Sequence, residues 1–124
     1  MLSGAWPEGR IRIREIHGVR VIEFHGEVDI ATAIGIEPEL DAATLDRDRI
    51  VIIDLSPVAF FDIYALRLLC RTEERVRTRG GRLLLVCPQK TTLRLLRAGH
   101  LMGRFAPVAT LEEALDAGGR LEAS

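Results

Sequence analysis

The chain of 124 residues (13.8 kDa) has the length of one domain and can bury a single hydrophobic core. Its composition, 48% hydrophobic and 28% charged with a formal net charge of -1, excludes a disordered chain and argues against a nucleic-acid-binding domain with a large basic excess. The apolar runs are far shorter than the ~20 residues of a membrane span and Met1–Glu8 lacks a signal-peptide pattern, so we expect a cytoplasmic protein without direct membrane insertion.

The start of the chain predicts a β-hairpin. Residues 1–9 show no periodicity and are expected to form a flexible arm. Ile11–Ile16 and Val19–Phe24 alternate apolar and polar residues on either side of the pair His17-Gly18. Two such runs joined by a short turn are typical of a hairpin.

A break at Gly26–Asp29 precedes the first predicted helix. Asp29 and Thr32 are both candidate N-caps, because their side chains can accept hydrogen bonds from free amides of a first turn. The helix is expected to reach about Thr44, with its apolar residues on one face: Ala33, Ile36, Leu40 and Ala43. Pro38 lacks an amide hydrogen and is expected to kink or split this helix.

The middle of the chain predicts two buried strands on either side of a long helix. Ile50–Ile53 and Arg82–Cys87 have continuously apolar centres, as in strands covered on both faces. Between them, Ser56–Phe61 is expected to be a loop, and Asp62 is expected to cap a helix over Ile63–Arg79. A Gly-Gly pair follows this helix and favours its end.

The last third predicts shorter elements: a helix over Thr91–Ala98, a short edge strand over Phe105–Val108 and a final helix to about Ala117. Thr110 and Glu113 have the spacing of a capping box at the start of that final helix. Residues 118–124 are expected to fray.

The order of these elements predicts a single α/β domain over residues 10–117. Because strands and helices alternate after the hairpin, the later strands should be parallel and joined by right-handed crossovers. We therefore expect a mixed sheet of four to five strands, with an N-terminal hairpin and about four helices.

The sequence contains no arrangement typical of an enzyme. It has neither a glycine-rich phosphate loop after a strand nor a G-x-S-x-G elbow, and of its three serines only Ser56 lies in the folded middle. The three histidines have no metal-ligand spacing to Cys or carboxylates. We expect no catalysis, no metal and no other cofactor.

Cys70 and Cys87 each lie within an apolar pattern. We interpret them as small core residues. The alternative is a redox pair, which would need Cα atoms within about 7 Å of each other.

Charge is unevenly distributed along the chain. Residues 23–54 hold nine acidic residues against two arginines, a net charge of -7, and residues 63–104 hold ten basic residues against two acidic ones, a net charge of +8. Such a dipolar molecule can attract a complementary partner, although both segments can equally be ordinary solvated faces. Arg67, Arg71 and Arg75 are spaced four apart and should form a stripe on one helix, either a part of the contact surface or a solvated face partly neutralised by Glu73 and Glu74.

Several segments together resemble the STAS domain, the fold of bacterial anti-sigma factor antagonists. These segments are Gly26–Ala33 (GEVDIATA), Ile50–Leu55, Phe60–Leu66, and Gly80-Gly81 leading into Leu83–Val86. The resemblance covers about residues 10–117, nearly the whole chain.

The resemblance implies a protein that binds an anti-sigma factor, often a serine kinase with an ATPase fold, and thereby frees a sigma factor. In this family the kinase phosphorylates a serine at the start of the second helix, in a motif that usually reads Asp-Ser-[Ser/Thr]-Gly-[Leu/Val]. Asp62 and Leu66 match this motif, whereas Ile63, Tyr64 and Ala65 depart from it. The position of the usual phosphoserine is Tyr64, so the usual phosphoacceptor is missing.

These matches predict a partner-binding surface on the Asp29–Thr32 loop, the Ser56–Asp62 loop and the first turns of the second helix. Its individually named residues are Asp29, Thr32, Asp62, Ile63, Tyr64, Ala65, Leu66 and Arg67. Tyr64 is an aromatic anchor, a space-filling residue or a phosphotyrosine acceptor. The expected function is that of a protein-binding regulatory module, an anti-sigma factor antagonist or a similar protein, with a homodimer possible. The alternative is a STAS accessory or ligand-binding subunit, for example of a transporter.

Overall fold

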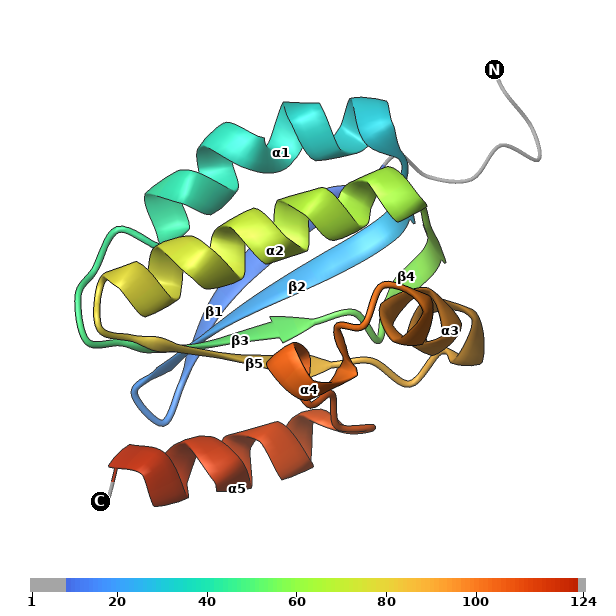
Figure 1. Ribbon diagram of the computed structural model, residues 1–124. Coiled ribbons are helices and arrows are strands. Elements are labelled where there is room, and N and C mark those ends of the chain that lie inside the picture. Colours follow the sequence, from blue (N-terminus) through green and yellow to red (C-terminus); the bar gives the residue numbers. More distant parts are fainter. Residues whose placement is uncertain (1–8, 123–124) are drawn as a thin grey trace.

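A computed structural model describes residues 9–122, which form five strands and five helices (Figure 1). In chain order these are β1 (Arg10–Ile16), β2 (Val19–Val28), α1 (Ile30–Ala43), β3 (Ile50–Asp54), β4 (Val58–Phe61), α2 (Ile63–Thr78), β5 (Arg82–Val86), α3 (Lys90–Ala98), α4 (Met102–Phe105) and α5 (Leu111–Glu122). The flexible arm expected over residues 1–9 lies, apart from Gly9, outside the described residues.

The strands form one mixed sheet in the order β1-β2-β3-β5, and β4 pairs with the C-terminal end of β2. β1 and β2 are antiparallel, as the predicted hairpin requires, whereas the other three pairings are parallel. Helix α1, between β2 and β3, and helix α2, between β4 and β5, carry the chain back so that the next strand can run in the same direction. The predicted mixed α/β architecture is therefore confirmed.

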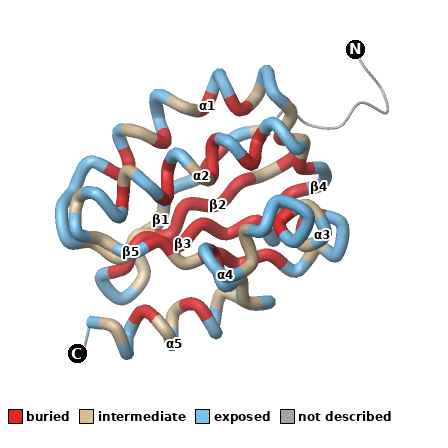
Figure 2. Tube along the Cα trace, in the orientation of Figure 1, coloured by how far each residue is buried: buried red, intermediate tan, exposed pale blue. Residues whose placement is uncertain are grey.

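Helices cover both faces of the sheet, with α1 and α2 on one face and α5 on the other (Figure 1). The larger core lies under α1 and α2 and includes Ile53 and Leu69, both 0% exposed, while the smaller core lies under α5 and includes Ile52 and Ala114. Ile52 and Ile53 belong to opposite cores because successive side chains of a strand point to opposite faces. The central strands are buried along most of their length (Figure 2).

Two segments expected to be irregular are strands. β2 continues through Gly26 to Val28, and Val58–Phe61, expected to be a loop, forms β4. Gly26 has a positive φ of 78°, and the register of the β2–β4 pairing shifts next to it. The pairing partner of β4 is remote in sequence, so a run of four residues could not indicate it.

Helix α1 is continuous from Ile30 to Ala43, so the prediction that Pro38 splits it is wrong. Pro38 is exposed, and its missing amide hydrogen costs the helix one hydrogen bond without ending it. Asp29, and not Thr32, is the N-cap of α1.

The C-terminal region differs from its prediction in two places. The edge strand expected over Phe105–Val108 is replaced by the short helix α4 and a single bridge between Val86 and Val108. Helix α5 reaches Glu122, beyond the expected end near Ala117, so residues 118–122 do not fray, and residues 123–124 lie outside the described residues. The glycines that suggested fraying include Gly118, which is buried against Ile50.

The predicted capping box at the start of α5 is confirmed in part. The Glu113 amide donates to the Thr110 hydroxyl over 3.2 Å. The Glu113 carboxylate accepts from the Thr110 hydroxyl, also over 3.2 Å. A full capping box would instead place that carboxylate on the Thr110 amide.

Gly81→Ala should destabilise the fold strongly, because a Cβ at position 81 would lie 2.3 Å from the carbonyl oxygen of Arg49. Backbone atoms of β3 or β5 would have to move, and we expect a loss of about 2–4 kcal/mol in the free energy of unfolding. Gly119→Ala is the matched control, since its Cβ meets nothing within 4 Å in a helix that alanine favours. Urea unfolding of both variants is the measurement, and equal midpoints would contradict the expectation.

Candidate partner-binding site

The starts of α1 and α2 are brought together by the β2–β4 pairing. Val28 and Phe61 are partners at the ends of their strands, and Asp29 and Asp62 follow them directly. The Asp62 amide donates to the Val28 carbonyl over 2.9 Å. The first turns of both helices therefore lie at the same end of the sheet, where the chain leaves two neighbouring parallel strands (Figure 1).

Each helix start is capped by its aspartate. Asp29 Oδ1 accepts from the Thr32 amide over 2.8 Å, and Asp62 Oδ1 accepts from the Tyr64 amide over 2.9 Å. The hydrogen bond from the Thr32 amide lowers the pKa of Asp29 below its ordinary value. Both first turns are thus fixed by charge-assisted hydrogen bonds.

An apolar patch surrounds these two helix starts. Seven large hydrophobic side chains are exposed among the described residues, and five of them lie on the first two turns of α1, on the first turn of α2 or on β4, which leads directly into α2. We define the apolar patch as these five, with their exposed fractions: Ile30 (49%), Ile34 (67%), Phe60 (51%), Ile63 (60%) and Tyr64 (50%). Exposed apolar side chains gathered in one place are typical of a binding surface.

The structure places the predicted site residues in three ways. Ile63, Tyr64 and Arg67 are exposed and can contact a partner, whereas Asp29, Thr32 and Asp62 hold the helix starts. Ala65 is 0% exposed and Leu66 is 7% exposed. Ala65 is therefore a core residue that supports the patch from beneath, and a direct role for it in partner contact is wrong.

Three residues of the patch were not named individually among the predicted site residues: Ile30, Ile34 and Phe60. Ile30 and Phe60 lie within segments that were assigned to the contact face, Asp29–Thr32 and Ser56–Asp62, whereas Ile34 lies outside them. The signal for Ile30 and Ile34 was available, because they are spaced four apart on α1 and lie outside its buried face. Phe60 lies on β4, where the sequence predicted a loop, and its side chain points away from the buried side chain of Phe61.

A shallow groove of ≈ 210 Å³ runs between α1 and α2 beside the patch, and Ile30, Ile34 and Tyr64 line it together with Arg67. The guanidinium carbon of Arg67 lies 5.9 Å from the centroid of the Tyr64 ring, a cation–π distance. Tyr64 is half-exposed, too open for a residue that only fills space in the core. This exposure argues against the space-filling alternative, and the role of Tyr64 as an anchor stays a prediction.

The arginine stripe of α2 is not a freely solvated face. Arg71 forms ion pairs with Glu37 and Asp41 of α1, the latter at 3.2 Å, and Arg75 lies 3.5 Å from Asp41. Part of the charge asymmetry seen in the sequence is thus neutralised within the molecule, across the α1–α2 contact. Arg67, at the patch end of the stripe, contacts the Tyr64 ring instead.

Gln89 fixes the segment that leads into β4, a contact that the sequence did not predict. Its Nε2 donates to the carbonyl oxygens of Leu55 (2.7 Å), Val58 (3.2 Å) and Ser56 (3.3 Å). This amide therefore positions the chain that carries Phe60 into the patch.

Gln89→Leu should reduce the free energy of unfolding by about 1–3 kcal/mol, because the carbonyls of Leu55, Ser56 and Val58 lose the hydrogen bonds from the Gln89 amide, and the Leu55 carbonyl keeps only the one from the Val58 amide. Lys90→Ala, at the neighbouring exposed residue, is the control and should change stability by less than about 0.5 kcal/mol. Hydrogen exchange of the β4 amides measures the local effect. Unchanged protection of β4 in the Gln89 variant would contradict this role.

The two cysteines are free thiols, Cys87 buried and Cys70 half-buried. Burial raises the pKa of both above the ordinary value, so both stay protonated near neutral pH and react slowly. This supports the interpretation as core residues over that as a redox pair.

Cys70→Ala combined with Cys87→Ala should lower the free energy of unfolding by about 1–2 kcal/mol and leave partner binding unchanged. Denaturant unfolding and binding of the same partner under oxidising and reducing conditions test this. The prediction would be contradicted if the natural protein bound its partner differently under oxidising and reducing conditions.

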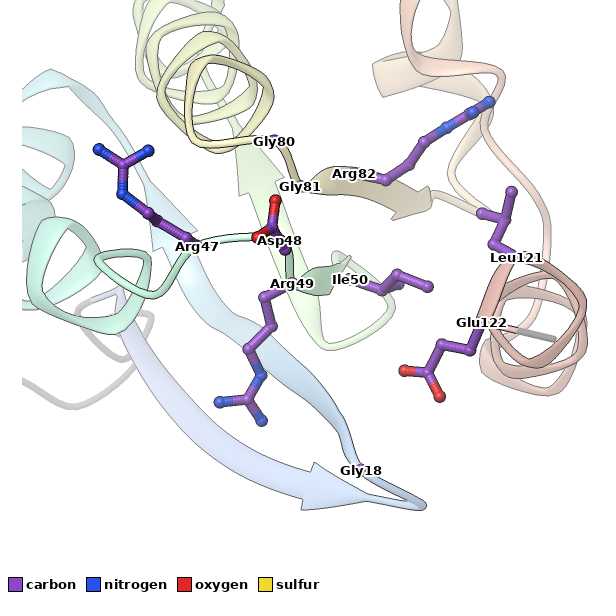
Figure 3. A pocket seen from close by; sticks show the side chains of 10 residues that line it. All are labelled: Gly18, Arg47, Asp48, Arg49, Ile50, Gly80, Gly81, Arg82, Leu121 and Glu122. Atoms are coloured by element: carbon purple, nitrogen blue, oxygen red, sulfur yellow. The ribbon is translucent and has the colours of Figure 1, made fainter. Parts of the chain in front are cut away.

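A second pocket, of ≈ 460 Å³, lies at the opposite end of the sheet, beside the first residues of β3 and β5 (Figure 3). Arg47, Arg49 and Arg82 line it, but their side chains point in different directions, with Asp48 beside them (Figure 3). Arg49 is bound by Glu15 and by Asp46, the latter at 3.0 Å. These arginines do not converge on a common point, so they do not form an anion site.

No helix within residues 9–122 is long and apolar enough to cross a membrane.

A STAS domain model matches residues 10–114, so the chain belongs to the STAS domain family. It is 30% identical over 117 residues to the anti-sigma-F factor antagonist RsfB of Mycobacterium tuberculosis, a match that covers 90% of this chain and 93% of RsfB. The crystal structure of an anti-sigma factor antagonist from Mycobacterium paratuberculosis superposes with a TM-score of 0.81 at 29% identity, covering 89% of this chain and 93% of that one. An anti-sigma-factor antagonist (STAS) domain protein from Planctomyces limnophilus superposes with a TM-score of 0.79 at 27% identity, covering 88% of this chain and 97% of that one.

Proposed function

We propose that this protein is an anti-sigma factor antagonist that acts by binding an anti-sigma factor and not by catalysis. The observation that carries the proposal is the apolar patch, which lies on the paired starts of α1 and α2. The names of the relatives support a regulatory role over that of an accessory or ligand-binding subunit.

The patch has the properties that a protein interface requires. A partner that covers its five side chains removes apolar surface from water, which contributes roughly 25 cal/mol for each Å² before the cost of association is subtracted. Tyrosine is enriched among the residues that dominate binding energies, because it combines a large apolar ring with a polar tip. Tyr64, backed by Arg67 and fixed by the Asp62 cap, is the residue we assign as the central anchor.

The same position makes the contact insensitive to a serine kinase. Tyr64 replaces the residue that the family phosphorylates, and its hydroxyl lies several ångströms farther from the backbone than a serine hydroxyl would. A displacement of ~1 Å in a catalytic geometry can reduce a rate by about 100-fold, so a site that aligns a serine oxygen with ATP should not accept this tyrosine. We propose that the partner is bound whether or not ATP is present.

Titration calorimetry with purified anti-sigma factors of the ATPase-fold class from the source organism tests this function. At least one should bind with a dissociation constant of about 1 µM or tighter, equivalent to ~8 kcal/mol. Binding should persist when ATP and Mg²⁺ are added. The absence of binding to every anti-sigma factor of the organism would refute the proposal.

A further inference from the structure

A second groove continues from the apolar patch between α2 and the α3–α4 region. It has a volume of ≈ 570 Å³. Ile63 of the patch and the neighbouring Arg67 line one side of it. Further along, its apolar lining comes from Leu66 on α2 and from Leu95 and Leu101 on the other side. A partner seated on the patch therefore has an apolar path onto this groove.

Helix α3, which lines one side of the groove through Leu95 and Ala98, is basic. No acidic residue occurs between Glu74 and Glu112, so α3 and α4 carry no carboxylate. The exposed side chains of Lys90, Arg94 and Arg97 lie on α3, and within residues 9–122 none of them forms an ion pair. Figure 2 shows that most of α3 is exposed.

The α2 side adds to this charge. Arg67 and Arg71 line the groove together with Glu74, which is the one carboxylate among its lining residues. Arg71 already forms ion pairs with Glu37 and Asp41 of α1. Arg67 forms no ion pair within residues 9–122 and lies against the Tyr64 ring. The basic charge that remains free is thus that of Arg67 and α3.

We infer that the groove between α2 and α3 binds an acidic amphipathic helix of the partner, with the apolar side of that helix against Leu66, Leu95 and Leu101 and its carboxylates near Arg67 and α3. The inference rests on the proposed function, because the groove is continuous with the proposed anti-sigma factor contact. An amphipathic helix fits because its apolar residues recur on one face and its charged residues flank them.

The direct test uses a synthetic helical peptide with leucines on one face and glutamates on the other, and a second peptide in which lysines replace the glutamates. Amide chemical shifts of the full chain report where each peptide binds. The glutamate peptide should shift amides of Leu66, Leu95 and Leu101 and bind at least about tenfold more tightly than the lysine peptide. Equal binding of the two peptides, or shifts elsewhere, would overturn the inference.

Charge reversal supplies the matched control. Arg94→Glu with Arg97→Glu should weaken binding of the glutamate peptide by about tenfold, because like charges then face each other. Arg47→Glu with Arg82→Glu makes the same change in net charge at the opposite end of the sheet and should leave binding unchanged (Figure 3). Equal weakening by both double variants would show a general effect of charge and overturn the inference.

The outcome separates this inference from the proposed function. If Arg94→Glu with Arg97→Glu leaves anti-sigma factor binding unaffected and the glutamate peptide does not bind, the groove is not a binding site. The proposed function would then still stand. If the glutamate peptide binds but no anti-sigma factor does, the groove is a binding site and the proposed function is refuted. Self-association that the same double variant abolishes would assign the groove to a second copy of the chain and also overturn the inference.

Discussion

Tyr64→Asp should weaken anti-sigma factor binding by at least about 100-fold while the domain stays folded. Residue 64 lies in the first turn of α2, where a carboxylate is stabilised by the helix dipole and free amides. The same carboxylate would lie in the middle of the apolar patch, where covering it without a partner charge costs several kcal/mol. Calorimetry should therefore show loss of binding, and circular dichroism should show a melting temperature close to that of the natural protein.

Two variants separate the patch from general effects. Leu45→Asp is the matched control, because Leu45 is 57% exposed and lies outside the patch. It should leave binding unchanged. Tyr64→Ala, which removes the ring without adding charge, should weaken binding by at least about 1 kcal/mol if the ring is an anchor. Full binding by both Tyr64 variants would show that the partner does not use the patch.

A serine kinase of the anti-sigma type should place no phosphate on residues 62–66 of the natural protein. The segment reads Asp-Ile-Tyr-Ala-Leu and contains no serine or threonine. Replacing Ile63, Tyr64 and Ala65 with Ser, Ser and Gly should create an acceptor and change phosphorylation from none to stoichiometric if the surrounding segment still fits the kinase. A phosphate at this helix start adds about -1.5 to -2 charges, so the phosphorylated variant should release its partner.

Mass spectrometry of residues 62–66 after incubation with kinase and ATP is the measurement. The triple variant needs a check of its fold, because Ala65 is buried and its replacement by glycine costs about 1 kcal/mol in helix propensity. The Ser-Ser variant that keeps Ala65 is a control for that loss. Stoichiometric phosphate on the natural segment, on Tyr64, would contradict the account and assign Tyr64 as a phosphotyrosine acceptor.

The elements that the sequence predicted well are those with strong local signals. Asp62 followed by an apolar periodic run marks the start of α2, and the β-branched run Ile50–Ile53 marks a central strand. The resemblance to the STAS domain placed the site at the start of α2, where the structure also shows Ile63 and Tyr64 exposed. That the exposed patch binds a partner stays a prediction.

What the sequence did not indicate depends on contacts between remote residues. β4 is four residues long and exists because Phe61 pairs with Val28, and α5 continues past Ala117 because Gly118 packs against the sheet. The cross-helix ion pairs of Arg71 could not be read from its neighbours in sequence, since its partners lie on α1. The burial of Ala65, in contrast, was readable from the sequence, because Ala65 lies on the buried face of α2 at helical spacing from Leu69 and Thr72.

The most direct test of the account is release of a sigma factor from its anti-sigma factor by this protein. A complex of the two, reconstituted from the source organism with fluorescently labelled sigma factor, is titrated with the natural protein and with Tyr64→Asp, in the presence of ATP and Mg²⁺. The account predicts that the natural protein releases the sigma factor at stoichiometric concentrations, that ATP does not reverse this release, and that Tyr64→Asp releases none. A complex that stays intact with the natural protein, or equal release by both proteins, would contradict it.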